Sequence, residues 1–222
     1  MSAAIPADRP FHRLRASRSY DRAMRAMGAL WFLLLAAAAI PNPHAPATAA
    51  QIAAKACLVA FYAILCALLL TRPPAKAQAE GIVPRVAAFV GTYLPWTIPL
   101  LAAPADAAAL NLASAGFFVV GMTLTLITVS HLGRAFSLVP QARTVVRSGP
   151  YRWLRHPLYF AEEIAVFGTM LQFLSPIALA IFLAHVTVQI RRIHYEEALL
   201  RRTFPEYSAY AAGNWRLLPY VW

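Results

Sequence analysis

Long runs of apolar residues recur along this chain and limit the folds that it can adopt. Four of them approach the length that a helix needs to cross the roughly 30 Å hydrocarbon core of a bilayer. They extend over residues 26–40, 50–70, 86–103 and 107–130. A further run, 164–190, is interrupted by Ser175-Pro176, which favours a hairpin of two short helices over one kinked span.

Of the 222 residues 60% are hydrophobic and 13% charged, against roughly 25% charged in soluble domains. The sequence predicts an all-α integral membrane protein with about six apolar helical segments, four spans plus a helical hairpin.

The basic residues predict the orientation of the chain. Its net charge of +11 is spread between the apolar runs instead of forming one basic patch on a soluble module, which argues against nucleic acid as a partner. If the chain crosses six times from a cytoplasmic N-terminus, all Lys and Arg residues except Lys55 face the cytoplasm. We therefore expect both termini on the cytoplasmic side of an inner or plasma membrane. A cleavable signal peptide near the N-terminus is the alternative, although its basic leader is long for one.

The polar residues concentrate in the C-terminal part. We expect one membrane domain, 1–222, in which 1–130 supply spans and 131–222 supply the functional part. The polar segment 131–159 is long for an unstructured connection, and it contains Arg155-His156-Pro157-Leu158-Tyr159. Pro157 fits the first turn of a helix, whose free N–H groups favour an anion. The alternative is that Arg155 and His156 only hold a helix end at the membrane interface.

A second polar segment follows the hairpin. Arg192 and Glu196 are four residues apart and share a helix face, so they form either a plain ion pair or part of a ligand site. Apolar and aromatic residues from Leu199 to Tyr210 then predict an amphipathic cytosolic helix at the interface, with a break near Pro205. We find no Cys or His cluster with metal-ligand spacing and expect no metal.

Several motifs in this part occur in a fixed order. They are Leu132 to Ser137 (LGRAFS), Ser148 to Tyr159 (SGPYRWLRHPLY), Glu196-Glu197, Phe204, Tyr207, Tyr210 and Pro219. Together they resemble the isoprenylcysteine carboxyl methyltransferase family over about residues 130–222. The resemblance implies a helical membrane enzyme that binds S-adenosyl-L-methionine on its cytosolic face and takes a lipid-linked acceptor from the bilayer.

The resemblance also implies a role for individual residues. Arg192 corresponds to the substrate-side arginine of the family and, with Glu196, is the expected catalytic pair. The implied cofactor contacts are Gln141, Thr144, Val145, Val146, Tyr151, His156, Pro157, Leu158, Tyr159 and Glu196. The expected reaction is methylation of a carboxylate on an isoprenylcysteine-like or other apolar acceptor. Such a carboxylate is ionised at pH 7, so no strong base is needed.

Other activities remain as alternatives. A protic acceptor would need a base, for which His194 or Tyr195 are the nearest candidates in the sequence. An NADPH-dependent sterol- or lipid-type reductase is a second enzyme class, because its terminal Arg-x-x-Pro-Tyr motif resembles residues 216–220. A non-enzymatic membrane protein is the third reading, but charged groups at a membrane boundary are costly without a ligand. The sequence does not name the methyl acceptor.

Overall fold

A computed structural model describes residues 18–40 and 49–222 of the protein. The predicted cytoplasmic N-terminus and most of the first outer connection lie outside these residues. The longer helices are α2 (Arg18–Ala39), α3 (Ala49–Thr71), α4 (Val83–Tyr93), α6 (Ala108–Leu132), α7 (Pro157–Gln172) and α8 (Pro176–Thr203). The shorter elements are the 3-10 helices η1 (Leu94–Thr97), η2 (Gly133–Ala135) and η3 (Gly149–Arg152), the helices α5 (Ile98–Leu101) and α9 (Tyr207–Ala212), and the strands β1 (Ala77–Gln78) and β2 (Gln141–Ala142).

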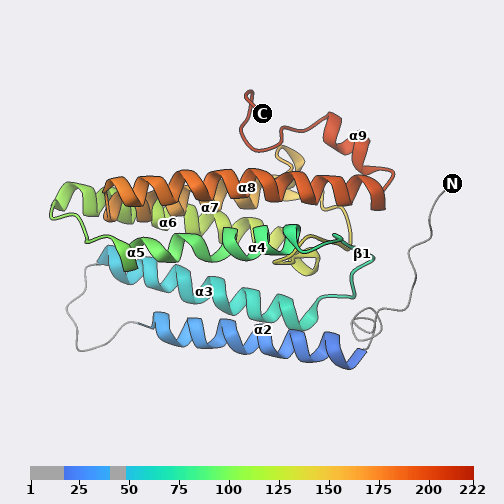
Figure 1. Cartoon of the computed structure of the whole chain (residues 1–222), viewed down its shortest axis with the longest axis horizontal. Coiled ribbons are helices and arrows are strands. Elements are labelled where there is room, and N and C mark those ends of the chain that lie inside the picture. The colour runs from blue at the N-terminus through green and yellow to red at the C-terminus, as the bar shows by residue number, and fades with distance from the viewer. Residues whose placement is uncertain (1–17, 41–48) are drawn as a thin grey trace.

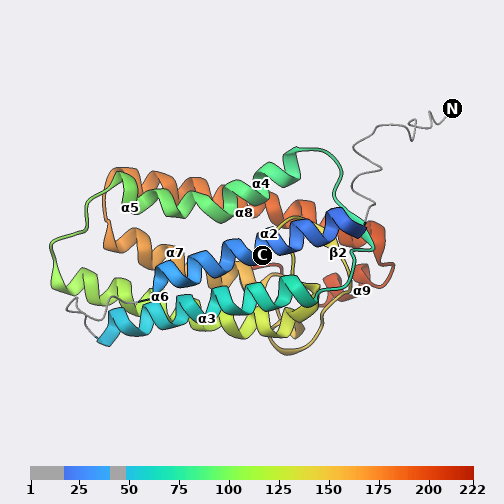
Figure 2. The same ribbon diagram turned by 90° about the horizontal axis from the view of Figure 1, so that it is seen from below.

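The long helices lie side by side along one axis, as Figures 1 and 2 show. Within the described residues, three helical segments are long and apolar enough to cross a membrane: Gln51–Thr71, Ala108–Ala135 and Pro176–Thr203. The chain is an integral membrane protein, as expected, whereas the number of six crossing segments remains a prediction. The break at Ser175-Pro176 is present, because α7 ends before it and α8 runs back antiparallel to α7 (Figure 1). Ser175 begins α8 by accepting a hydrogen bond from the backbone N–H of Ala178 at 3.2 Å.

The third apolar run is divided, which the sequence analysis did not predict. Helix α4 ends at Tyr93, and the chain continues in nearly the same direction through η1 and α5 (Figure 2). Pro95 and Pro99 explain the division, because proline has no N–H for the helical ladder and its ring clashes with the preceding turn. One carbonyl that this division leaves without a helical donor is that of Gly91, four residues before Pro95.

Helices α6 and α7 approach closely because small residues line their contact. A Cβ atom at Gly121 would overlap the backbone of Ala165, and one at Gly168 would lie 2.7 Å from the backbone nitrogen of Phe118. Van der Waals packing of small residues is a main source of helix association where lipid replaces water. This pair holds the N-terminus of α7 beside the C-terminus of α6, at the end of the bundle that carries the polar residues.

At that polar end, loops and one pair of short strands connect the helices. Strand β1 pairs antiparallel with β2, with Ala77 opposite Ala142 and Gln78 opposite Gln141. The protein is mostly helical, as predicted, and this pair of two-residue strands is a small addition to the helices. Arginines tie the loops to the end of α3 and to the residues just after it, since Arg134 Nε donates to the carbonyl of Thr71 at 2.7 Å and Arg143 Nε to that of Pro73 at 2.9 Å. The sheet positions Gln141 and the segment that follows it.

The C-terminal helix differs from the prediction. Helix α8 continues without interruption to Thr203, the chain turns at Phe204, and α9 has only six residues. The predicted break is present, but a single amphipathic helix is not found in the described part of the chain. Phe204, Tyr207 and Ala211 instead pack with Ala142 in a small core that holds α9 against β2.

Candidate active site

One cavity of about 590 Å³ runs from the polar end of the bundle into its apolar interior. The structure brings all but one of the expected site residues to this cavity: Gln141, Thr144, Val145, Val146, Tyr151, His156, Leu158, Tyr159, Arg192 and Glu196. Pro157 does not line it and instead lies buried in the first turn of α7. The residues come from the loop after α6, from the start of α7 and from α8, so their convergence depends on the fold.

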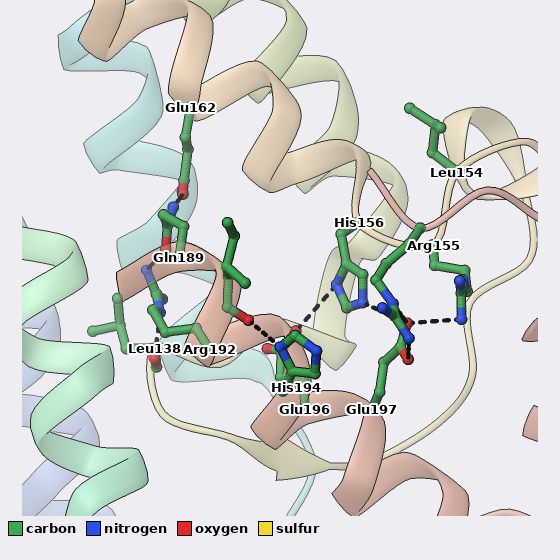
Figure 3. A network of polar contacts seen from close by, with 12 residues as sticks. Leu138, Leu154, Arg155, His156, Glu162, Gln189, Arg192, His194, Glu196 and Glu197 are labelled. Atoms are coloured by element: carbon green, nitrogen blue, oxygen red, sulfur yellow. Dashed lines mark hydrogen bonds and ion pairs between the residues drawn. The ribbon is translucent and has the colours of Figure 1, made fainter. Parts of the chain in front are cut away.

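His156 lies at the centre of the polar end, just before α7, between two carboxylates (Figure 3). Its Nδ1 is 3.5 Å from Glu196 Oε2 and its Nε2 is 3.3 Å from Glu197 Oε1. Burial acts to lower the pKa of the imidazole, but hydrogen bonds and charge from both glutamates outweigh it. The pKa of His156 is therefore above its ordinary value of 6.5. A protonated ring donates from both nitrogens, which suits a position between two carboxylates.

Glu197, which the sequence analysis named as part of a motif without giving it a role, anchors this end of the structure. Its side chain is 5% exposed, and Arg155 Nη1 lies 2.9 Å from Oε1. Arg216 binds the same carboxylate through two hydrogen bonds, from Nε at 3.2 Å and from Nη2 at 3.1 Å. Such two-point pairing of arginine with a carboxylate is strong and directional. Glu197 thus ties the C-terminal segment to the start of α7. The sequence alone cannot distinguish this role from that of Glu196, because the two are adjacent residues of the same type.

Arg192 is buried, with 5% of its surface exposed, and its partners are neutral. Its Nη1 donates to Gln189 Oε1 at 2.6 Å and its Nη2 to the carbonyl of Leu138 at 3.5 Å. Its guanidinium carbon lies 4.9 Å from the ring centre of Tyr159. The ion pair with Glu196 that the spacing allowed is not formed, since Glu196 contacts His156 instead. Within the described residues, Arg192 is a buried cation beside the cavity with no ion-pair partner.

Two further polar residues line the cavity deeper in the bundle, and the sequence analysis missed their place in it. Glu162 on α7 accepts a hydrogen bond from Gln189 Nε2 at 3.1 Å, and His185 on α8 is 2% exposed. Spacing on α8 could have found His185, because His185, Gln189, Arg192 and Glu196 recur on one helix face, whereas Glu162 belongs to α7. By contrast, His194 is exposed and bonded to the carbonyl of Ile190, so this suggested base lies outside the cavity.

Unsatisfied polar groups at the cavity wall test whether a nucleoside cofactor fits. The Tyr151 hydroxyl and Arg155 Nε are buried and have no hydrogen-bond partner in the described part of the chain. Burial raises the pKa of Tyr151 well above its usual value, so its hydroxyl keeps its proton and can donate. The Tyr210 hydroxyl donates to the Tyr151 carbonyl at 2.6 Å and fixes this segment. The donors and the Glu196 carboxylate suit the ribose and amino-acid groups of S-adenosyl-L-methionine.

The remainder of the cavity wall is apolar and aromatic. Helices α2 and α3 contribute Phe32 and Tyr62, whose rings stack with their centres 6.2 Å apart, and Trp96 of η1 lies beside Tyr62. The lining extends to Ala39, the last residue of α2, at the end of the bundle opposite the polar site (Figure 2). The N-terminal helices thus supply an apolar chamber that is continuous with the polar end.

Comparison with known proteins gives two findings. Residues 110–207 match the family described as phospholipid methyltransferase. Over 102 residues the chain is 34% identical to the nickel-cobalt-cadmium resistance protein NccN of Alcaligenes xylosoxydans xylosoxydans. That alignment covers 44% of this chain and 47% of NccN, so the chain matches less than half the length of this relative.

The matched residues contain α7, α8 and nearly all of α6, together with most of the polar side chains around the cavity. The family's description names phospholipids and not prenylated cysteine. The resemblance of this chain to membrane methyltransferases is confirmed, because residues 110–207 carry the sequence pattern of the phospholipid methyltransferase family.

Proposed function

We propose that this protein is a membrane methyltransferase that uses S-adenosyl-L-methionine and modifies an apolar or lipid-linked acceptor at the cytoplasmic side of the membrane. The observation that carries this proposal is one continuous cavity, polar at one end and apolar along the rest. A cofactor with charged groups and an acceptor with a long apolar part need these two environments next to each other. Besides the acceptor, the apolar helices imply the lipid bilayer as a partner of the protein.

Residues at the polar end would hold the cofactor. The Glu196 carboxylate would accept from ribose hydroxyls, and Tyr151 and Arg155 would use the donors that now have no partner. His156 would hold Glu196 in place, since its ring contacts that carboxylate. S-adenosyl-L-methionine supplies an electrophilic methyl group on a sulfonium. The protein then contributes to the rate by positioning the acceptor and excluding water.

A carboxylate is the acceptor group that we propose first. Arg192 is buried, and in the described part of the chain its hydrogen bonds go to neutral acceptors and no carboxylate pairs with it directly. A buried cation without a direct ion pair is costly. An incoming carboxylate would relieve that cost, and arginine would orient it without transferring a proton, because its pKa is far above 7. An ionised carboxylate needs no base.

A protic acceptor, such as an amine, is the second candidate. The observation that favours it is Glu162, which lines the cavity and accepts from Gln189 through Oε2. The proton released when an N–H group is methylated would pass to this carboxylate. The structure gives less support to the reductase alternative, because Arg216 is bound to Glu197 and Tyr220 is 88% exposed.

Ligand-induced thermal stabilisation of the purified protein tests the cofactor. S-adenosyl-L-methionine and S-adenosylhomocysteine should each raise the unfolding temperature, because a ligand at 100 times its Kd adds about 2.7 kcal/mol to stability. The shift should be lost in Glu196→Ala and His156→Ala and kept in Glu206→Ala, whose carboxylate is exposed at the same end. A response to NADPH alone would contradict the proposal.

Methyl transfer to apolar acids and to amines with the same tail tests the acceptor. Methyl esters release methanol in alkali and N-methyl groups do not, so labelled product separates the two candidates. We expect Arg192→Gln to raise the KM for the acid while leaving stabilisation by S-adenosylhomocysteine unchanged. Transfer to the amine alone, lost in Glu162→Gln, would establish the second candidate instead.

A further inference from the structure

The division of the third apolar run brings helix α4 into contact with α8. Pro95 has no N–H to donate to the carbonyl of Gly91, so that carbonyl needs another partner. His185 of α8 supplies it, with Nε2 at 2.9 Å from the Gly91 oxygen. Both residues are buried. The bond joins two helices that are 94 residues apart in the chain.

The partners of His185 determine where its protons lie. A carbonyl oxygen only accepts, so Nε2 must carry hydrogen. The other nitrogen, Nδ1, lies 3.1 Å from Glu163 Oε1. This contact is at ion-pair distance, but neither His185 Nδ1 nor either oxygen of Glu163 forms a hydrogen bond among the described residues. The contact with His185 is therefore the interaction that can orient the Glu163 side chain.

The same part of α4 also packs against Arg192. A Cβ atom at Gly91 would lie 2.7 Å from Arg192 Cδ and 3.3 Å from Gln189 Oε1. His185, Gln189 and Arg192 share one face of α8 at helical spacing. The absence of a side chain at Gly91 thus leaves room for the methylene groups of Arg192. The carbonyl of Gly91 is bound by His185, which lies about two turns before Arg192 on α8.

We propose that Glu163, His185 and Gly91 act together as positioning residues for Arg192. Glu163 orients the His185 ring, His185 holds α4 through the Gly91 carbonyl, and α4 presses the Arg192 side chain toward the cavity. This proposal rests on the proposed function, in which Arg192 binds the acceptor. It adds residue 91, which lies outside the residues that match the methyltransferase family, to the acceptor site.

Two substitutions of Glu163 separate positioning from charge. In Glu163→Gln the side-chain amide can donate to Nδ1, so the contact persists with a neutral ring. In Glu163→Leu it is lost. We expect Glu163→Leu to raise the acceptor KM about tenfold or more, and Glu163→Gln to stay within about threefold of wild type. Stabilisation by S-adenosylhomocysteine should be the same in both, because the cofactor end is not touched. Equal acceptor KM in the two variants would overturn the proposal.

A double substitution tests whether the effect passes through Arg192. Gly91→Ala should raise the acceptor KM in the wild-type background and add little in Arg192→Gln, because the guanidinium whose position it would change is already absent there. Gly116→Ala is the matched control, since a Cβ there meets nothing within 4 Å. Additive effects of Gly91→Ala and Arg192→Gln would show that Gly91 acts elsewhere.

Hydrogen exchange of the amides of α4 tests the contact of Glu163, His185 and Gly91 without relying on activity. Exchange should be faster in Glu163→Leu than in wild type and unchanged in Glu163→Gln. If this pattern is found but no adenosyl compound stabilises the protein, the contact of Glu163, His185 and Gly91 is supported and the proposed function fails. If exchange in α4 is the same in all three proteins, the proposal fails even where methyl transfer is observed.

Discussion

At the scale of single residues, two adjacent glutamates have different tasks. Glu197 binds Arg155 and Arg216 and is almost fully buried, whereas the Glu196 side chain is 29% exposed and reaches the cavity. Helical geometry separates neighbours by about 100°, so consecutive residues point in different directions. One carboxylate is therefore enclosed by arginines, while the other contacts His156 and faces the cavity.

Glu197→Gln should lower the stability of the protein. It would leave Arg155, Arg216 and His156 without their shared anion, and removal of one partner from a buried charged cluster costs about 3–5 kcal/mol. We expect a fall of several degrees in the unfolding temperature in detergent. Glu206→Gln, at an exposed position in the same region, is the control and should change stability by less than about 0.5 kcal/mol. Equal shifts would show that the cluster is not stabilising.

His156 should make stability depend on pH. Its pKa in the folded protein is above 6.5, so its contribution is fully present below that pH and is lost as the pH rises through the folded-state pKa. Unfolding temperatures measured from about pH 6 to about pH 9 should fall more steeply for wild type than for His156→Gln. A slope unaffected by His156→Gln would contradict the assignment.

At the scale of helices, the sequence predicted the apolar segments and the hairpin but not how they join at the site. Pro95 is visible in the sequence, yet the partner that replaces its missing hydrogen bond, His185, is distant in the chain and depends on packing. The strands β1 and β2 have two residues each, too short for any periodic signal. The motif residues were predicted to lie together because the family resemblance supplied what periodicity cannot.

The close contact of α6 and α7 gives a test at this scale. Gly121→Ala should destabilise the protein by about 1–3 kcal/mol, because the added methyl overlaps the backbone of Ala165. Gly116→Ala on the same helix should have no effect or stabilise slightly, by up to about 1 kcal/mol. Thermal unfolding of the two variants checks this directly. If both substitutions behave alike, α6 and α7 are not packed through Gly121.

At the scale of the whole molecule, charge is distributed along one axis. The helix ends that carry arginines, at the start of α2 and after α3, α6 and α8, gather at the same end as the polar site (Figure 1). The connection at Asp106, at the opposite end, contains no Lys or Arg. This asymmetry is the physical basis for expecting the site to face the cytoplasm.

Cysteine labelling can establish that orientation. In a background without Cys57 and Cys66, Arg152→Cys and Asp106→Cys place single thiols at exposed positions of opposite ends. A membrane-impermeant maleimide added to intact cells should label the cysteine at 106 and not the one at 152, and inverted vesicles should give the reverse. Labelling of both from one side would show that the ends do not lie across a bilayer.

Two different parts of the chain supply the walls of the cavity. The wall that would hold the methyl donor belongs to the residues shared with the methyltransferase family, while much of the apolar wall comes from α2, α3 and α4, which precede them. Mutations in those three helices can reshape the chamber without altering the donor's contacts. For the proposed methyltransferase, this separation means that substitutions in α2 to α4 should change which acceptor is taken while binding of the methyl donor is kept.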